Sequence, residues 1–186
     1  MKILKASDDA MQEAVSVIKN GGVVAHATET CYGLACDLAN ESALKKLFAL
    51  KKRPEGMPVS ALVSSVEEAK TFVLWNGKAQ ELAEKYWPGP LTIVLPKKGS
   101  ESTLGIRVSS HPIAQKLVEL CGVPISTTSA NLHGQPEPYS AEEVAAQLQP
   151  DLILDSGELP TAEPSTVVVV KNGELEIVRQ GAITVL

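Results

Sequence analysis

Short apolar runs alternate with segments of helical period along most of the chain, and this alternation limits the possible folds. The runs read as strands cover residues 22–27, 59–63, 91–95, 104–108, 124–128, 152–154, 166–170 and 175–179. Capping residues and apolar periodicity predict helices that begin at Ser7, Asn40, Ser65, Lys78, His111 and Ser140. Strands interleaved with helices indicate an α/β domain with a central sheet.

The end of the chain makes that sheet mixed. Residues 166–170 and 175–179 flank Lys171-Asn172-Gly173, and Asn-Gly between two strand-like runs is a strong hairpin signal. We therefore expect a twisted mixed β-sheet flanked by helices. A length of 186 residues suits a single domain over 1–186 with a sizeable core.

Composition favours an intracellular globular protein. The chain is 44% hydrophobic and 21% charged, and it lacks the roughly 20 consecutive apolar residues of a membrane span. Its N-terminus has no long apolar segment of the secretory type. Three cysteines without a framework spacing fit reduced thiols, so we expect a cytoplasmic protein with no membrane association and no protein-held metal.

Polar residues collect where the strands end. In open α/β sheets, ligands bind beyond the strand ends, so these residues are candidates for one pocket. Arg107 stands out because a buried arginine needs a partner, and a bound anion would be one. Hydroxyls nearby would complete the hydrogen bonds of a polar ligand. The chain has neither a G-x-x-x-x-G-K-[ST] nor a G-x-G-x-x-G motif.

Seven stretches, in this order, carry a resemblance to a known family. They are "ATETCYGLACD", "LKKRPEGMPV", "YWPGPLTIVL", "STLGIRVSSHP", "STTSANLHGQP", "PSTVVVV" and "VRQGAI". Together they run from about residue 22 to 183 and resemble the YrdC/TsaC family, the threonylcarbamoyl-AMP synthases, in its short single-domain form.

The resemblance implies an ATP-dependent nucleotidyltransferase with a YrdC-like fold. Members condense L-threonine, bicarbonate and ATP into L-threonylcarbamoyl adenylate and release pyrophosphate, usually with Mg²⁺ on the phosphates. A separate transferase then modifies adenosine in ANN-decoding tRNAs. Such chemistry needs orientation and charge stabilisation more than a protein nucleophile.

The resemblance also implies roles for individual residues. Those matched to threonine binding are Thr30, Tyr32, Arg107, Thr127 and Ser165. Lys51 and Arg53 match a catalytic K-x-R pair near the ATP phosphates. The other residues matched to the nucleotide are Thr103, Ser129, Asn131 and Arg179.

Two departures from the family pattern concern the threonine side. His26-Ala27 stands where the family often has proline before Thr28. Met57 and Leu62 occupy positions where the long form has asparagine-proline and then a histidine that helps hold threonine. Because Thr30 and Arg107 remain, we expect threonine binding without that histidine.

Two other functions stay open. A YrdC-like domain could adenylate a different carbamate. Alternatively, the basic cluster Lys45, Lys46, Lys51, Lys52 and Arg53 could be the phosphate-binding patch of an RNA-binding module, or give weak tRNA binding. The net charge of −5 and an aromatic content of only 4% count against an RNA-binding platform.

Overall fold

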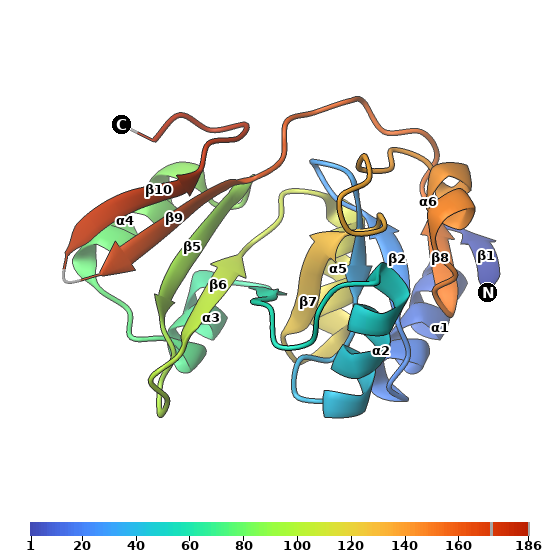
Figure 1. Cartoon of the computed structure of the whole chain (residues 1–186), viewed down its shortest axis with the longest axis horizontal. Helices are drawn as coiled ribbons and strands as arrows, with labels where there is room; N and C mark the ends of the chain where they lie inside the picture. Colours follow the sequence, from blue (N-terminus) through green and yellow to red (C-terminus); the bar gives the residue numbers. More distant parts are fainter. Residues whose placement is uncertain (172, 186) are drawn as a thin grey trace.

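One mixed β-sheet with helices packed against it accounts for most of the residues that the computed structural model describes, 1–171 and 173–185 (Figure 1). The strands are β1 (Lys2–Lys5), β2 (Val24–Ala27), β3 (Tyr32–Ala35), β4 (Ser60–Leu62), β5 (Leu91–Pro96), β6 (Thr103–Arg107), β7 (Ile125–Ser129), β8 (Leu152–Asp155), β9 (Thr166–Lys171) and β10 (Glu174–Arg179). The helices are α1 (Asp8–Lys19), α2 (Glu41–Lys51), α3 (Val66–Phe72), α4 (Gly77–Tyr86), α5 (Pro112–Cys121) and α6 (Ala141–Gln147). The predicted α/β class and mixed sheet are confirmed.

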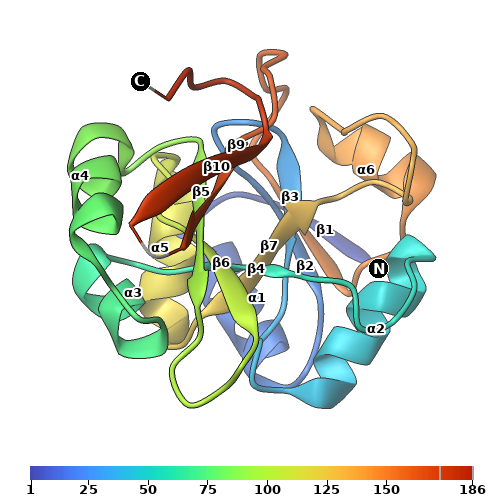
Figure 2. The same cartoon turned by 60° about the vertical axis from the view of Figure 1, so that its left-hand side comes forward.

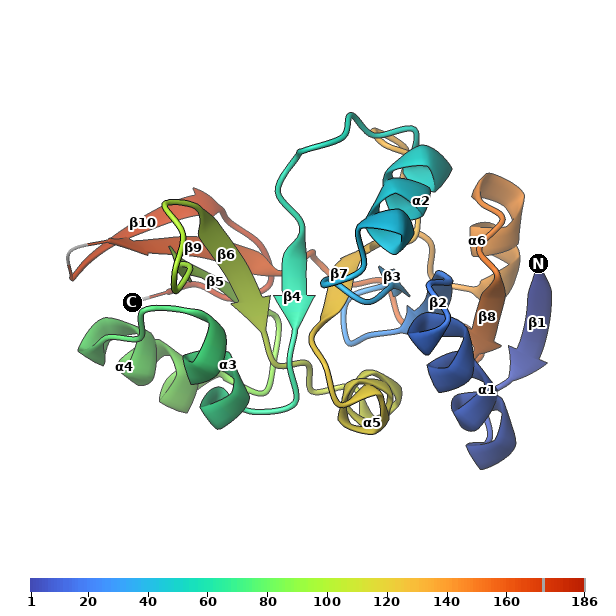
Figure 3. The same cartoon turned by 90° about the horizontal axis from the view of Figure 1, so that it is seen from below.

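The sheet has the order β1-β8-β2-β3-β7-β4-β6-β5-β9-β10. Figure 3 shows β4 between two groups of strands, with β5, β6, β9 and β10 on one side and β7, β3, β2, β8 and β1 on the other. Strand β4 pairs parallel with β6 and antiparallel with β7, so it joins the two groups.

Alternation along the strands directs apolar side chains to both faces. Val24 packs with α1 and α5, whereas its neighbours Val23 and Ala25 pack with α2 and α6. A third apolar cluster lies between α3, α4 and strands β5, β6 and β9. Figure 2 shows the sheet between α3 and α4 on one side and α2 and α6 on the other.

Side-chain caps begin the helices as the sequence predicts. The side chains of Ser7, Asn40, Ser65 and Ser140 each accept a hydrogen bond from the backbone N–H three residues later. Each bond satisfies one of the free donors of a helix N-terminus. Among the described helices, none combines the length and the apolar character needed to cross a membrane.

Two strands were missed by the sequence analysis. Strand β1 is a mostly exposed edge strand that pairs with β8, so it lacks the apolar alternation of a half-buried strand. Strand β3 returns antiparallel to β2 after the tight turn 28–31. Gly33 and the polar residues before it obscure a strand whose four residues are all buried. The polar motif "TET" is therefore the turn of a hairpin.

The predicted C-terminal hairpin is present, with β9 and β10 antiparallel. Asn172 of its predicted turn lies outside the described residues, and Gly173 follows with φ of 82°. Beyond β10, Gly181 donates its N–H to Thr166 Oγ1 at 3.0 Å. The chain after β10 thus packs against the start of β9.

We expect Gly181→Ala to destabilise the protein. A Cβ atom at this position would lie 2.1 Å from the carbonyl oxygen of Pro164, so the backbone beside Ser165 must move. Overpacking of this kind lowers the free energy of unfolding by about 1–3 kcal/mol, which urea denaturation measures. The control is Gly77→Ala, where a Cβ meets no atom within 4 Å. Equal stability of both variants would contradict the expectation.

Candidate functional site

A cavity of about 200 Å³ lies where strand ends from both groups of the sheet meet. The turn 28–31 and the end of β7 contribute from one group, and β5, β6, β9 and β10 contribute from the other. The residues that line it are Thr28, Thr30, Cys31, Gly33, Arg53, Pro58, Val59, Ser60, Thr92, Arg107, Thr127, Thr128, Ser129, Glu137, Pro164, Ser165, Val167 and Arg179. Hydroxyls and arginines dominate this surface.

Most of the residues singled out in the sequence meet in this cavity. Those in its lining are Thr30, Arg53, Arg107, Thr127, Ser129, Ser165 and Arg179. Four others, Tyr32, Lys51, Thr103 and Asn131, are not among the lining residues. Residues from strand ends that are far apart in the sequence therefore meet at one cavity. Fewer of the candidate side chains line this cavity than the sequence analysis expects.

One partner of Arg107 is a carboxylate of the protein itself, which the sequence analysis did not anticipate. Arg107 Nη2 lies 2.8 Å from Glu29 Oε1, and both side chains are largely buried. Burial by itself raises the pKa of Glu29, but Arg107 and the Ser109 hydroxyl outweigh it and hold the pKa below its usual value. Glu29 was assigned no role in the sequence analysis because its partner is distant in sequence.

Hydrogen bonds fix the turn that carries Thr30. The Thr28 hydroxyl donates to the carbonyl oxygen of Cys31 at 2.7 Å and accepts from the backbone N–H groups of Thr30 and Cys31. The two hydroxyls are 3.0 Å apart, and donation from Thr30 to Thr28 is the direction that leaves the Thr28 proton on the carbonyl oxygen of Cys31. Thr30 Oγ1 also accepts from Arg107 Nη2 at 3.3 Å. Toward a ligand, Thr30 is thus an acceptor.

Lys51 lies behind the cavity and is only 2% exposed. Its ammonium donates to the carbonyl oxygen of Ser129, to that of Asn131 at 2.9 Å, and to Asn131 Oδ1 at 3.3 Å. Burial and the charge of Arg53 lower the pKa of Lys51 to about 8. With its donors occupied, this lysine holds the end of β7 in place.

Asn131 is likewise used inside the protein. Its Oδ1 accepts from the Ser129 hydroxyl at 2.6 Å, and its amide donates to the carbonyl oxygen of Gln135. Ser129 therefore presents its oxygen to the cavity as an acceptor. Lys51 and Asn131 position this acceptor from behind.

Two further arginines line the cavity, Arg53 from the loop between α2 and β4 and Arg179 from the end of β10. Arg53 Nη2 donates to the carbonyl oxygen of Pro58 at 2.7 Å, and its Nε has no hydrogen-bond partner among the described residues. Arg179 donates through Nε and Nη2 to the carbonyl oxygen of Ser165, and through Nη2 to the Ser165 hydroxyl at 2.9 Å. The hydroxyl of Thr92 lies 3.2 Å from that of Ser165.

Tyr32 and Thr103 lie away from the cavity. The Tyr32 hydroxyl donates to the carbonyl oxygen of Gly157 at 2.8 Å and accepts from Ser156 N–H at 2.9 Å, beside β8. Alternation along β3 explains this, because Cys31 and Gly33 on either side line the cavity. Thr103 begins β6 and Arg107 ends it, which separates them by roughly 13 Å along the strand.

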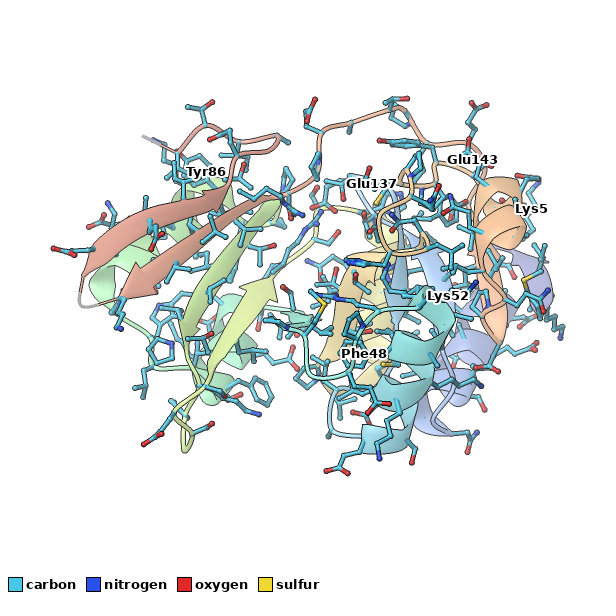
Figure 4. All side chains as sticks on the ribbon, viewed as in Figure 1. Lys5, Phe48, Lys52, Tyr86, Glu137 and Glu143 are labelled. Carbon is cyan, nitrogen blue, oxygen red and sulfur yellow. The ribbon has the colours of Figure 1, made fainter. Side chains whose placement is uncertain are left out.

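Glu137 lines the cavity and has no role in the sequence analysis. It belongs to the loop between β7 and α6, and Figure 4 labels it. Its position between Pro136 and Pro138 was the available signal, since flanking prolines restrict a loop. The cavity-lining cysteine, Cys31, has a pKa raised to about 11, chiefly by burial.

Of the residues that depart from the family pattern, His26 and Leu62 are core positions, whereas Met57 is partly exposed. Leu62 is 1% exposed and packs in the apolar cluster with α1 and α5. His26 is fully buried, which lowers its pKa to about 4, and its Nδ1 lies 3.0 Å from the carbonyl oxygen of Ala27. Neither side chain is part of the cavity lining.

The basic cluster does not form one exposed patch. Lys46 pairs with Asp151 at 2.6 Å, Lys51 is buried, and Arg53 faces the cavity. Lys45 and Lys52 remain exposed. Three of the five cations, Lys45, Lys46 and Lys52, are exposed, so the cluster gives weaker support to an RNA-binding surface than the sequence suggests.

We expect Lys51→Met to lower the free energy of unfolding by about 2–4 kcal/mol, because it leaves buried carbonyl oxygens without a donor. Urea denaturation measures the change. Lys52→Met is the matched control, because Lys52 is the next residue along the chain and is exposed. Figure 4 labels Lys52 at the end of α2. It should alter stability by less than about 0.5 kcal/mol. A Lys51→Met variant as stable as this control would refute the structural role.

Comparisons with known proteins agree with this fold. Residues 16–181 match the model of the Sua5/YciO/YrdC family, which is described as "Telomere recombination". The chain is 34% identical to the threonylcarbamoyl-AMP synthase of Vibrio cholerae, over 92% of this chain and 97% of that protein. It is 36% identical to that of Pyrococcus abyssi, over 91% of this chain but only 53% of the longer relative.

A solved structure gives the same result. The crystal structure of P. abyssi Sua5 complexed with L-threonine superposes with a TM-score of 0.87 and 33% identity. The match covers 97% of this chain and 56% of that one, so this chain spans about half the length of the archaeal protein. Sequence and structure together place the chain in the Sua5/YciO/YrdC family.

Proposed function

We propose that this protein condenses L-threonine, bicarbonate and ATP into L-threonylcarbamoyl adenylate and releases pyrophosphate. One observation carries the proposal: Arg107 with Thr30, and Arg53 with Arg179 and Ser129, line a single cavity in a fold of this family. An amino acid carboxylate and a triphosphate are both anions that arginine binds well. Relatives named threonylcarbamoyl-AMP synthase support this choice of substrates.

Arg107, Thr30, Thr127 and Ser165 form the proposed threonine side. Arg107 binds the carboxylate of threonine, and Thr30 Oγ1 accepts a hydrogen bond from the amino group or the hydroxyl of the substrate. Thr127 and Ser165 supply further hydroxyls from β7 and from the start of β9. Tyr32 is left out because its hydroxyl is fully engaged beside β8.

Arg53, Arg179 and Ser129 form the proposed nucleotide side. The two guanidinium groups balance the charge of the phosphates and of the leaving pyrophosphate. Lys51 and Asn131 do not line the cavity but position Ser129, because they hydrogen-bond to its backbone carbonyl and its hydroxyl. Thr103 is left out because it lies at the far end of β6.

The reaction needs no protein nucleophile. The amino group of threonine and bicarbonate give a carbamate and water, and a carbamate oxygen then attacks the α-phosphorus of ATP. The bond from that phosphorus to the bridging oxygen breaks, and pyrophosphate leaves. The protein's contribution is to hold the carbamate and the α-phosphate in line within a cavity lined by hydroxyls and cations.

Mg²⁺ would enter with the nucleotide. The described residues contain no group of three or more His, Cys, Asp or Glu side chains that could hold a metal. One carboxylate in the lining, Glu137, suits an ion bound mainly by phosphates, since Mg²⁺ often has only one or two protein carboxylates. Bound there, the ion would neutralise phosphate charge.

The product would pass to a tRNA-modifying transferase. A mixed anhydride of a carbamate with AMP is an activated group donor, so its use requires an acceptor enzyme for threonylcarbamoyl-adenosine formation in ANN-decoding tRNA. We also propose a cytoplasmic location, which fits the three free, buried thiols of the described residues. No separate observation favours the adenylation of another carbamate.

Pyrophosphate release from ATP is the direct test. The purified protein should release pyrophosphate only when L-threonine and bicarbonate are both present, because the carbamate is the attacking group. A coupled phosphate assay with each substrate omitted in turn measures this. Release that continues without threonine would exclude the proposed reaction.

Two arginine substitutions should separate the two sides of the cavity. Arg107→Ala should raise the KM for threonine more than about tenfold, because charge-assisted hydrogen bonds contribute roughly 1.5–3 kcal/mol each. Arg53→Ala should raise the KM for ATP in the same way and leave the KM for threonine within about threefold. Steady-state kinetics with one substrate varied provide the measurement. If both variants behave like wild type, the ligand site lies elsewhere.

A further inference from the structure

Glu29 touches the proposed threonine clamp without lining the cavity. Arg107 is in the lining and Glu29 is not, although their side chains meet at 2.8 Å. The carboxylate therefore contacts the arginine away from the space a ligand would fill.

The carboxylate is itself held from behind. The Ser109 hydroxyl donates to Glu29 Oε2, and Ser109 Oγ accepts from the backbone N–H of His111 at 3.2 Å. His111 is the residue that caps α5. A chain of contacts thus runs from the start of α5 through Ser109 and Glu29 to Arg107.

The contacts of Arg107 with Glu29 and Thr30 involve a single nitrogen of the guanidinium, Nη2. Nη2 of Arg107 lies against both Glu29 Oε1 and Thr30 Oγ1. Its Nε is buried with no hydrogen-bond partner among the described residues. A long, flexible side chain is thereby fixed at Nη2. Nη1 makes no hydrogen bond or ion pair with the described residues and, unlike Nε, is not fully buried, so it is the donor that remains for a ligand.

We propose that Glu29 is the positioning residue of this clamp: it orients Arg107 so that the unpaired donors of the guanidinium meet the substrate carboxylate. The proposal rests on the proposed function, since it takes L-threonine as the ligand. Thr30 alone does not fix the arginine, because its hydroxyl lies 3.3 Å from Arg107 Nη2, whereas Glu29 Oε1 lies 2.8 Å from the same nitrogen and is held in place through Ser109.

Glu29 makes two separable contributions, orientation and charge. Glu29→Ala removes both. Glu29→Gln keeps an oxygen for Arg107 Nη2 and an amide that can donate to Ser109 Oγ, but it removes the negative charge. If orientation is the main contribution, the Gln variant retains threonine binding and the Ala variant loses it.

The test compares L-threonine with L-threoninol, which has the same amine and hydroxyl but no carboxylate. Titration calorimetry on the full chain should show that Glu29→Ala weakens threonine binding about tenfold or more. The same variant should leave the binding of threoninol and of a non-hydrolysable ATP analogue within about threefold of wild type. Glu29→Gln should restore threonine binding to within about threefold of wild type.

Ser109 and Ser110 provide a matched pair of controls. Ser109→Ala removes the hydroxyl that holds Glu29 and should weaken threonine binding several-fold, whereas Ser110 is exposed and its replacement by Ala should have no effect. Circular dichroism establishes that each variant is folded. A Glu29→Ala variant that weakens threonine and threoninol equally has only a structural defect, and that result overturns the proposal.

Arg107→Ala distinguishes a failure of this inference from a failure of the proposed function. If Arg107→Ala loses threonine while Glu29→Ala keeps it, Glu29 does not position the clamp and the assignment of Arg107 stands. If wild type and Arg107→Ala bind threonine equally, the assignment of Arg107 is wrong, and the inference fails with it.

Discussion

The pairing of β4 with both β6 and β7 is the constraint on which the rest of the structure depends. This strand has only three residues, yet it connects the two groups of strands through parallel bonds on one edge and antiparallel bonds on the other. Ala61 and Leu62 are almost fully buried, so the joint is closed by apolar side chains as well as by backbone hydrogen bonds. The register places Leu62 opposite both Arg107 of β6 and Ile125 of β7, and Ser60 opposite Thr127, so residues of β6 and β7 face each other across β4 and the cavity has two facing walls.

Polar side chains line that cavity because the protein satisfies most of them internally. Arg107 has Glu29, Arg179 has Ser165, and Lys51 has the carbonyl groups at the end of β7. Each pairing offsets part of the free energy that burial of a charge costs. It also limits the freedom of the side chain, so the site is organised before a ligand arrives. The donors and acceptors left over define what can bind.

Local signals made most of the fold predictable. Helix caps such as Ser7 and Asn40 act within three residues, and the apolar strands carry their own periodicity. Strand β3 was missed because its start follows a polar turn and its pairing with β7 is long-range. Arg107 was recognised as a candidate binding residue from its apolar neighbours in the sequence. Glu29 lies 78 positions earlier in the chain, and nothing in its local sequence indicates that it pairs with Arg107.

The sequence also did not predict which candidate side chains line the cavity and which hold the lining residues in place. Lys51 and Asn131 stand in motifs that match ligand-binding residues of the family, but their side chains hold Ser129. Tyr32 shares its motif with Thr30, but its side chain points away from the cavity. Residues an even number apart lie on one face only within a strand, and Thr30 belongs to the turn 28–31 that precedes β3. Only the folded chain fixes such directions.

Cys31 has a consequence for the chemical durability of the site. A thiol whose pKa is about 11 is almost entirely protonated at neutral pH, and the thiolate is the form that reacts with peroxides and alkylating agents. Burial therefore keeps this sulfur of the cavity wall in its less reactive, protonated form. At this position cysteine serves as a small, largely buried residue of the hairpin turn beside the arginines.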